Sequence, residues 1–138
     1  MRFKGVLNME KFELFVGYFG NGATVCNSAV YDHGDYKKVA HISPAGNIKL
    51  FVRSGYIPAD AMIKIENIAR NHKQKTIDRL NIALTIDRYD FNHNYSRILD
   101  EIFNYTSYQK QIELINSLAG KKTPEKIELI KEYYLLNF

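Results

Sequence analysis

The fold of the first third of this chain depends on one glycine-rich stretch, "YFGNGATVCN" (residues 18–27). Glycines at positions 17, 20 and 22 follow an apolar run, as they do in loops that cradle phosphate. A dinucleotide fingerprint has the order G-x-G-x-x-G and leads into a helix, whereas the order here is G-x-x-G-x-G and residues 23–31 begin no helix. A Walker loop would continue as Gly-Lys-Ser/Thr, but Gly22 is followed by Ala23 and Thr24. We therefore predict that residues 20–22 form a tight turn and hold no nucleotide.

The residues on either side of this turn have the pattern of an antiparallel sheet. In "EKFELFVGYF" (residues 10–19) apolar side chains recur at every second position, which is typical of a strand. Two further apolar runs, "KVAHIS" and "NIKLFVR", flank the hairpin signature "SPAGN" (residues 43–47). Residues 9–55 thus predict a three- or four-stranded antiparallel β-meander, in which Gly17 marks a bulge or a close backbone approach.

After Pro58 the spacing of the apolar residues changes from two to three and four, which predicts helices. A long helix is expected to contain Met62, Ile65, Ala69, Leu80 and Ala83. Residues 87–95 have no stable apolar stripe and are predicted to link it to a second helix at 95–103. A third helix at 108–118 stops near Gly120, and a fourth starts at residues 123–125. The chain is thus expected to be a single α+β domain, 1–138, with about four helices in its helical part, 58–138.

The composition is that of an ordinary globular protein, with 46% hydrophobic residues, a net charge of +4 and one cysteine. No run reaches the ~18 apolar residues of a membrane span, and one cysteine agrees with a reducing compartment. We therefore expect a protein of the bacterial cytoplasm with no membrane partner. Residues 1–8 are expected to be a non-native leader before Met9, because the codons of residues 4–6 can contain a ribosome-binding sequence. A genuine N-terminal arm is the alternative.

The sequence contains no catalytic constellation. The four histidines lack metal-ligand spacing, and His41, between apolar neighbours, is expected to be packed and hydrogen-bonded in a strand. Cys26 has no nearby basic residue to lower its pKa, so a small buried residue is favoured over a nucleophile. We predict no catalytic residue, no metal and no cofactor.

Two groups of residues are candidates for binding. The charged side of the long helix carries Lys64, Arg70, Lys73, Lys75 and Arg79. A solvated helix face or a contact with nucleic-acid phosphates would both explain these cations. Aromatic residues of the sheet, for instance Tyr18, Phe15 and Phe51, are either structural or platforms on which bases stack.

The second candidate group is the carboxy-terminal stretch "YYLLNF". A surface helix needs only one apolar stripe, so this end is either sunk into the domain or meets another molecule. The interface candidates are Tyr133, Tyr134, Leu135, Leu136 and Phe138, for a protein partner or a second copy of the chain.

Residues 16–52 contain four short patterns in order: G-Y-F-G-N-G, V-C-N, G-D-Y-K and A-H-I-S. In these patterns the chain resembles a group of small proteins from phages and mobile elements of AT-rich bacteria. The resemblance carries over no catalytic or binding residue. It implies an accessory protein that acts on host machinery, for example as an inhibitor of CRISPR effectors or other defence systems.

These observations lead to a non-enzymatic accessory protein that binds a host protein or a protein–nucleic-acid complex, with inhibition of host defence as its expected role. The alternative is a nucleic-acid-binding accessory factor that uses the basic side of the long helix. An enzyme acting on nucleotides or cyclic signals, with a site shared between two subunits, is the third hypothesis.

Overall fold

A computed structural model describes residues 14–19, 22–32 and 35–138, without the side chains of residues 19, 28–32 and 35–37. The expected leader, residues 1–8, lies outside the described residues. So do residues 20–21 and 33–34, where turns were predicted.

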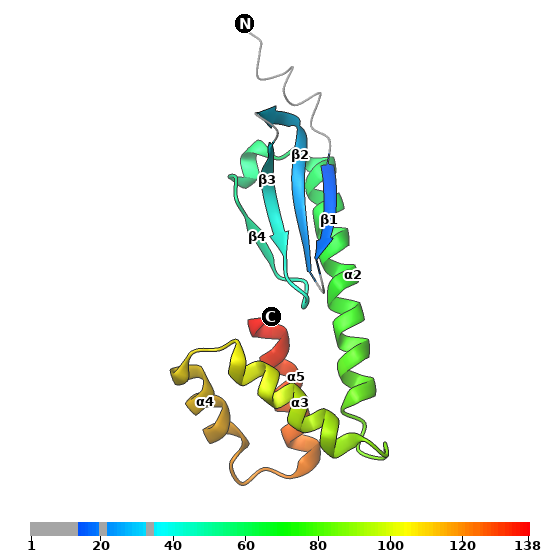
Figure 1. Ribbon diagram of the computed structural model, residues 1–138, viewed down its shortest axis with the longest axis vertical. Coiled ribbons are helices and arrows are strands. Elements are labelled where there is room, and N and C mark those ends of the chain that lie inside the picture. Colours follow the sequence, from blue (N-terminus) through cyan, green and yellow to red (C-terminus); the bar gives the residue numbers. More distant parts are fainter. Residues whose placement is uncertain (1–13, 20–21, 33–34) are drawn as a thin grey trace, which may run out of the picture. The chain divides into compact units, whose positions relative to one another are not determined.

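The first part of the chain forms a four-stranded antiparallel sheet in the order β1-β2-β3-β4 (Figure 1). The strands are β1 (Leu14–Phe19), β2 (Gly22–Asp32), β3 (Asp35–Ile42) and β4 (Ile48–Leu50). Each strand pairs with the one that follows it along the chain, so the predicted meander is confirmed. A short 3-10 turn, η1 (Ser54–Tyr56), follows the sheet.

The register explains which side chains face the core. Val16, Val25, Ala40 and Leu50 lie opposite one another across the four strands, and all four belong to one hydrophobic cluster. The pairing of β1 with β2 runs without a shift through Gly17, so the predicted bulge is not found there. Instead the register of β2 and β3 shifts next to Val25, which leaves Val39 as an extra buried residue in β3.

The predicted hairpin at residues 43–47 is confirmed by its hydrogen bonds. The backbone N–H of Gly46 donates to the Ser43 carbonyl at 2.9 Å, and the Ser43 hydroxyl accepts from the Asn47 N–H at 2.9 Å. Gly46 has a φ of 83°, a conformation that costs side-chain-bearing residues free energy. A Cβ at this position would overlap the Ala69 carbonyl oxygen and lie 2.8 Å from the Lys73 Cβ, so glycine lets the turn approach the helix.

The rest of the chain forms four helices: α2 (Ala59–Ala83), α3 (Phe91–Asn104), α4 (Tyr108–Leu118) and α5 (Thr123–Asn137). The carbonyl of Pro58 accepts the first hydrogen bond of α2, from the Met62 N–H. Ser107 caps α4 through its hydroxyl, and Gly120, with a φ of 75°, ends the same helix as the sequence predicted. The α+β arrangement is thus the one expected. None of the described helices is both long and apolar enough to cross a membrane.

The predicted linker at residues 87–95 was wrong in its second half, because α3 begins at Phe91. The apolar stripe of this helix is completed by a polar residue, Asn94, which is buried at a core position one turn before Ile98. Phe91 and Tyr95 pack against the same core, with their ring centroids 5.7 Å apart.

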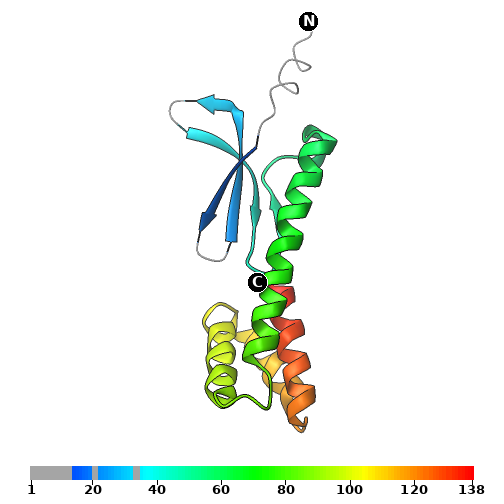
Figure 2. The same ribbon diagram turned by 90° about the vertical axis from the view of Figure 1, so that its right-hand side faces the viewer.

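The chain divides into two compact units, and the boundary between Lys73 and Gln74 falls inside α2. The sheet unit, which ends at Lys73, has a core made by the strands together with Ile57, Ala61, Ile65 and Ala69. Figures 1 and 2 show this part of α2 along one face of the sheet. The helical unit, residues 74–138, has a separate core formed by the last turns of α2 and by α3, α4 and α5.

Candidate functional surfaces

The glycine-rich stretch lacks the geometry of a phosphate loop in the residues that the structure describes. Gly22 begins a strand and not a helix, so no helix N-terminus follows the glycines. Phe19 lies opposite Gly22 in the antiparallel register, and Tyr18 lies opposite Ala23. A Cβ on Gly22 would lie 2.8 Å from the Ile42 carbonyl oxygen, which gives this glycine a steric reason in the sheet.

The predicted basic side of α2 is not a single surface within the sheet unit. At 3.6 residues per turn, Lys64 and Arg70 lie about 120° apart around the helix, and Lys64 and Lys73 about 180° apart. All three are exposed, and the Arg70 guanidinium donates to the Asn67 side chain at 2.9 Å. Cations on opposite sides of a helix cannot contact one phosphate backbone together.

The remaining two candidate cations lie in the helical unit and differ from each other. Lys75 is exposed, whereas Arg79 is half-buried. The Nη2 atom of Arg79 donates to the Tyr134 hydroxyl at 2.6 Å, and its guanidinium carbon lies 5.4 Å from the centroid of the same ring. Arg79 therefore has a structural partner inside the protein.

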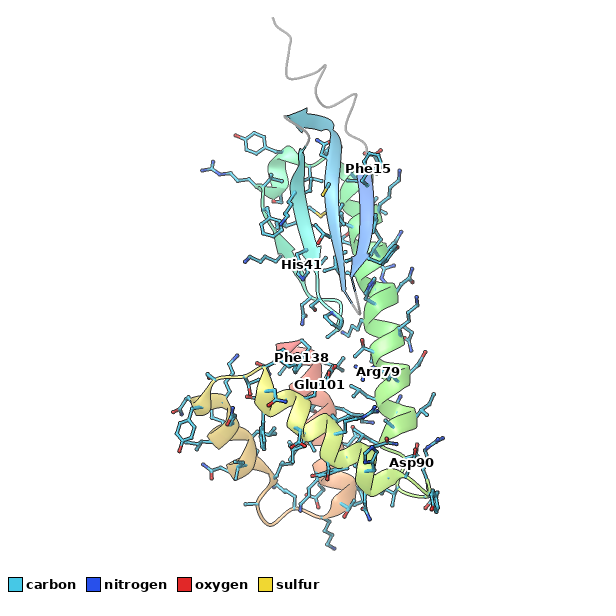
Figure 3. The ribbon with its side chains drawn as sticks, viewed as in Figure 1. Phe15, His41, Arg79, Asp90, Glu101 and Phe138 are labelled. Carbon is cyan, nitrogen blue, oxygen red and sulfur yellow. The ribbon has the colours of Figure 1, made fainter. Side chains whose placement is uncertain are left out.

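Tyr134 links three helices through one hydroxyl (Figure 3 labels its neighbours). Its side chain is only 1% exposed, and its hydroxyl donates to Glu101 Oε1 at 2.6 Å while it accepts from Arg79. Phe138 stacks on the tyrosine ring with centroids 4.3 Å apart. A buried phenol thus has both a donor and an acceptor, as buried polar groups require.

The same surroundings raise the pKa of Tyr134 above its ordinary value of 10.0. Burial is the largest cause, since the charged phenolate is disfavoured away from water. The hydrogen bond to Glu101 raises the pKa further, and Arg79 offsets part of the rise. The tyrosine is therefore a neutral structural group over the physiological pH range.

The candidate residues at the carboxy terminus have different environments. Tyr134 lies in the core, so it is not available to a partner. Tyr133 is half-buried and donates from its hydroxyl to the Lys110 carbonyl at 2.9 Å, while Leu135 and Phe138 are also half-buried. Leu136 is 80% exposed. Most of this apolar end is thus sunk into the helical unit, which is one of the two outcomes that the sequence left open.

Strongly exposed aromatic and apolar side chains nevertheless occur at the end of α5 and around the start of α4. The Tyr105 ring meets the Phe138 ring edge-on at 6.1 Å, and Lys110 Nζ donates to the Asn137 side chain at 2.8 Å. These contacts join the last turn of α5 to the segment that begins α4. We call these exposed residues together with Phe138 the aromatic end of the helical unit; its members are Tyr105, Tyr108, Leu136 and Phe138. The first three of these are strongly exposed.

The sheet unit has a second exposed surface, on the side of the sheet opposite to the core. The register places Gly17, Thr24, His41 and Lys49 opposite one another. Each is the neighbour, within its strand, of a residue that faces the core, so all four face the other side. We call this side the open sheet face; its members are Phe15, Gly17, Thr24, Cys26, Lys38, His41, Lys49 and Phe51. Phe15 and Phe51 are 51% and 45% exposed. Figure 3 labels Phe15 and His41 on their strands.

Two sequence predictions fail at least in part on this face. His41 lies in strand β3 with its Nδ1 3.5 Å from the Thr24 hydroxyl, as predicted, but it is exposed and not packed. Cys26 is half-buried and not fully buried. Both residues alternate with core residues, so the apolar neighbours of His41 in the sequence belong to the other face of the sheet. No cluster of three metal-ligating side chains occurs among the described residues.

Sequence reasoning missed the partner of Tyr134. Glu101 comes three residues after Ile98 on α3 and so lies on the side of that helix that faces the core. An acid at such a position is a signal of a buried polar contact, but nothing local indicates that its partner is Tyr134. Tyr18, named beside Phe15 and Phe51 as a platform, belongs to the opposite face, where it stacks on His72 at 5.8 Å.

No family model, curated protein or solved structure matches this chain.

Proposed function

We propose that this protein is a non-enzymatic accessory protein of a phage or mobile element. It acts in the cytoplasm of a bacterial host by binding a host protein or a protein–nucleic-acid complex. Its expected role is inhibition of a host defence system such as a CRISPR effector. The resemblance of residues 16–52 to small proteins of such elements supports this context by association.

The observation that carries the proposal is the aromatic end of the helical unit. Tyr105, Tyr108 and Leu136 leave large apolar or aromatic surface in water. Two hydrogen bonds, from Lys110 to Asn137 and from Tyr133 to the Lys110 carbonyl, join α4 to α5 nearby. Tyrosine is enriched in protein interfaces because its large ring can be buried at low entropic cost while its hydroxyl stays hydrogen-bonded. This chemistry suits a protein partner with an apolar surface.

The test is protection of a targeted phage. In a host with an active CRISPR system, expression of the protein should restore plaque formation to the level of cells that lack the system. Tyr105→Ser combined with Leu136→Ser should abolish this protection, since the partner loses two strongly exposed apolar contacts. The control is Ile115→Ser, another exposed apolar position on α4 that is not a member of the aromatic end, and it should retain protection.

Two results would contradict the proposal. One is full protection by the Tyr105/Leu136 variant. The other is a failure of both the native protein and the control to protect the phage in any of several hosts, each of which carries a different defence system. Light scattering of the purified protein tests whether the aromatic end binds a second copy of the chain. A native mass of twice the chain mass that falls to the chain mass in the double variant would assign these residues to a homodimer.

The alternative function, nucleic-acid binding by the cations of α2, has weaker support. Lys64 and Lys73 lie on opposite sides of the helix, and Arg79 is held by Tyr134. Within the sheet unit a different surface has the chemistry for this ligand.

A further inference from the structure

In the part of the sheet unit that the structure describes, α2 lies on the core side of the sheet, and the open sheet face carries exposed side chains. The core-facing residues of the sheet, such as Val25 and Ala40, pack against α2, and the residues that alternate with them along the strands face the other side. Figures 1 and 2 show α2 on one face of the sheet only. The most exposed apolar side chains on the other face are Phe15 and Phe51.

These two phenylalanines stand at opposite edges of the face. Phe15 is on β1 and lies opposite Cys26, which lies opposite Lys38. Phe51 follows β4, and its N–H donates to the Val39 carbonyl at 2.8 Å, beside Lys38. Both rings therefore lie at nearly the same height along the strands, about 14 Å apart if three strand spacings separate them.

The charged side chains described on this face are all cations. Lys38, Lys49 and the nearby Arg53 are exposed, and no carboxylate is present among the described side chains of the face. None of these three cations has a carboxylate partner within the described part of the chain. Lys49 Nζ lies 5.6 Å from the centroid of the Phe51 ring, so a positive charge accompanies an exposed aromatic surface.

Exposed aromatic rings, beside cations that have no carboxylate partner among the described residues, match one class of ligand. Bases of a single strand stack on aromatic side chains, while its phosphates pair with lysine and arginine. Four-stranded sheets of RNA-binding modules present aromatic side chains in this way. A double helix hides the faces of its bases, and an apolar protein surface would leave the cations without partners.

We propose that the open sheet face binds single-stranded nucleic acid. Two bases stack on Phe15 and Phe51, and the intervening phosphates follow Lys38, Lys49 and Arg53. This inference goes beyond the protein docking proposed for the helical unit and does not depend on it.

Fluorescence anisotropy with the full chain tests the proposal. The probes are fluorescein-labelled 12-nucleotide oligouridylate, the oligothymidylate of the same length and a 12-base-pair duplex. We expect both single strands to bind more tightly than the duplex. Three phosphate contacts predict a weakening of about 20-fold between 50 and 200 mM salt, at a slope of about 0.7 per phosphate.

Two sets of variants distinguish base stacking on the rings from non-specific apolar or electrostatic binding. Phe15→Leu and Phe51→Leu keep an apolar side chain but remove the ring, and each should weaken binding by about tenfold, within the range for one stacked base. Lys38→Glu with Lys49→Glu should weaken binding at least as much. The matched control, Lys64→Glu with Arg70→Glu on α2, changes the charge equally and should leave most of the affinity. Circular dichroism confirms that each variant is folded.

Several outcomes overturn the proposal. The face does not bind single strands if the native protein ignores both oligonucleotides at 50 mM salt, or if the duplex binds as tightly. If only the Lys64→Glu/Arg70→Glu variant binds the oligonucleotides more weakly, the binding site lies on α2 and not on the sheet. If the leucine variants lose a host protein from nuclease-treated extract while no oligonucleotide binds, the face is a protein-docking surface instead.

Discussion

The two units use the same helix in different ways. In the sheet unit, α2 contributes Ala61 and Ala69 to the core, and the sheet contributes Ala23 and Ala40. In the helical unit the same helix contributes Leu80 and Leu84, which pack against isoleucines and leucines of the other helices. Small residues bring backbones close together, whereas large ones fill the wider space between helices.

This difference determines what each unit tolerates. A backbone packed closely against a helix leaves no room for an added atom, so the sheet unit depends on glycine and alanine at particular positions. The helical unit depends on volume and on one buried polar cluster, Arg79–Tyr134–Glu101. The stability of the sheet unit is therefore most sensitive to added atoms. The stability of the helical unit is most sensitive to lost side-chain volume and lost hydrogen bonds.

The strongest test of this comparison is an alanine at Gly46. The new Cβ would meet the helix backbone and the Lys73 Cβ, and the residue would keep a φ of 83°. Strain and overlap together should cost about 4 kcal/mol of unfolding free energy. Gly120→Ala is the matched control, because it has a φ of 75° but no heavy atom within 4 Å of its Cβ. It should cost only about 1 kcal/mol, the price of the left-handed conformation alone. Equal losses, measured by urea denaturation, would show that φ and not close packing decides both.

Core truncations sharpen the comparison next. Ile65→Ala and Leu80→Ala each remove a fully buried side chain from α2, one from each core, and each should cost about 3 kcal/mol. Hydrogen exchange read by mass spectrometry should show the loss of protection for Ile65→Ala mainly before residue 74, and for Leu80→Ala mainly after it. The two clusters share no buried residue. Uniform loss of protection across the chain in both variants would instead favour the single cooperative domain expected from the sequence.

The sequence carried enough information for those features that local chemistry decides. The turn at residues 43–47 has its own hydroxyl acceptor and a glycine at the position with positive φ. The end of α4 has Gly120, and the change of period after Pro58 follows from one helix face being apolar. Each of these causes acts between residues that are close along the chain, so the local sequence is enough to predict its effect.

The features that the sequence concealed depend on distant contacts. The extra residue Val39 in β3 is a property of the pairing between two strands. Asn94 fills a core position, although its polarity interrupts the apolar stripe of α3. Tyr134 looked like part of a surface because the satisfaction of its hydroxyl comes from residues 33 and 55 positions away. The faces of the sheet likewise separate His41 from the apolar neighbours that made it seem packed.

The smallest predicted effect concerns the polar cluster of the helical unit. Tyr134→Phe keeps the ring and its stacking on Phe138 but removes two hydrogen bonds, which should cost about 1–2 kcal/mol at pH 7. The control Tyr89→Phe changes a fully exposed ring and should stay within about 0.5 kcal/mol of the native protein.

The pH dependence tests the same cluster, because burial raises the folded-state pKa of Tyr134 above 10.0. The stability that this neutral phenol contributes is fully present below pH 10.0. It is lost as the pH rises through the folded-state pKa, since the unfolded chain releases the proton first. Urea denaturation across pH 7–11 should therefore show a smaller alkaline loss in Tyr134→Phe than in the native protein or in Tyr89→Phe. An unchanged alkaline loss would mean that the folded-state pKa of Tyr134 is not raised, and that its hydroxyl is not buried as the structure shows.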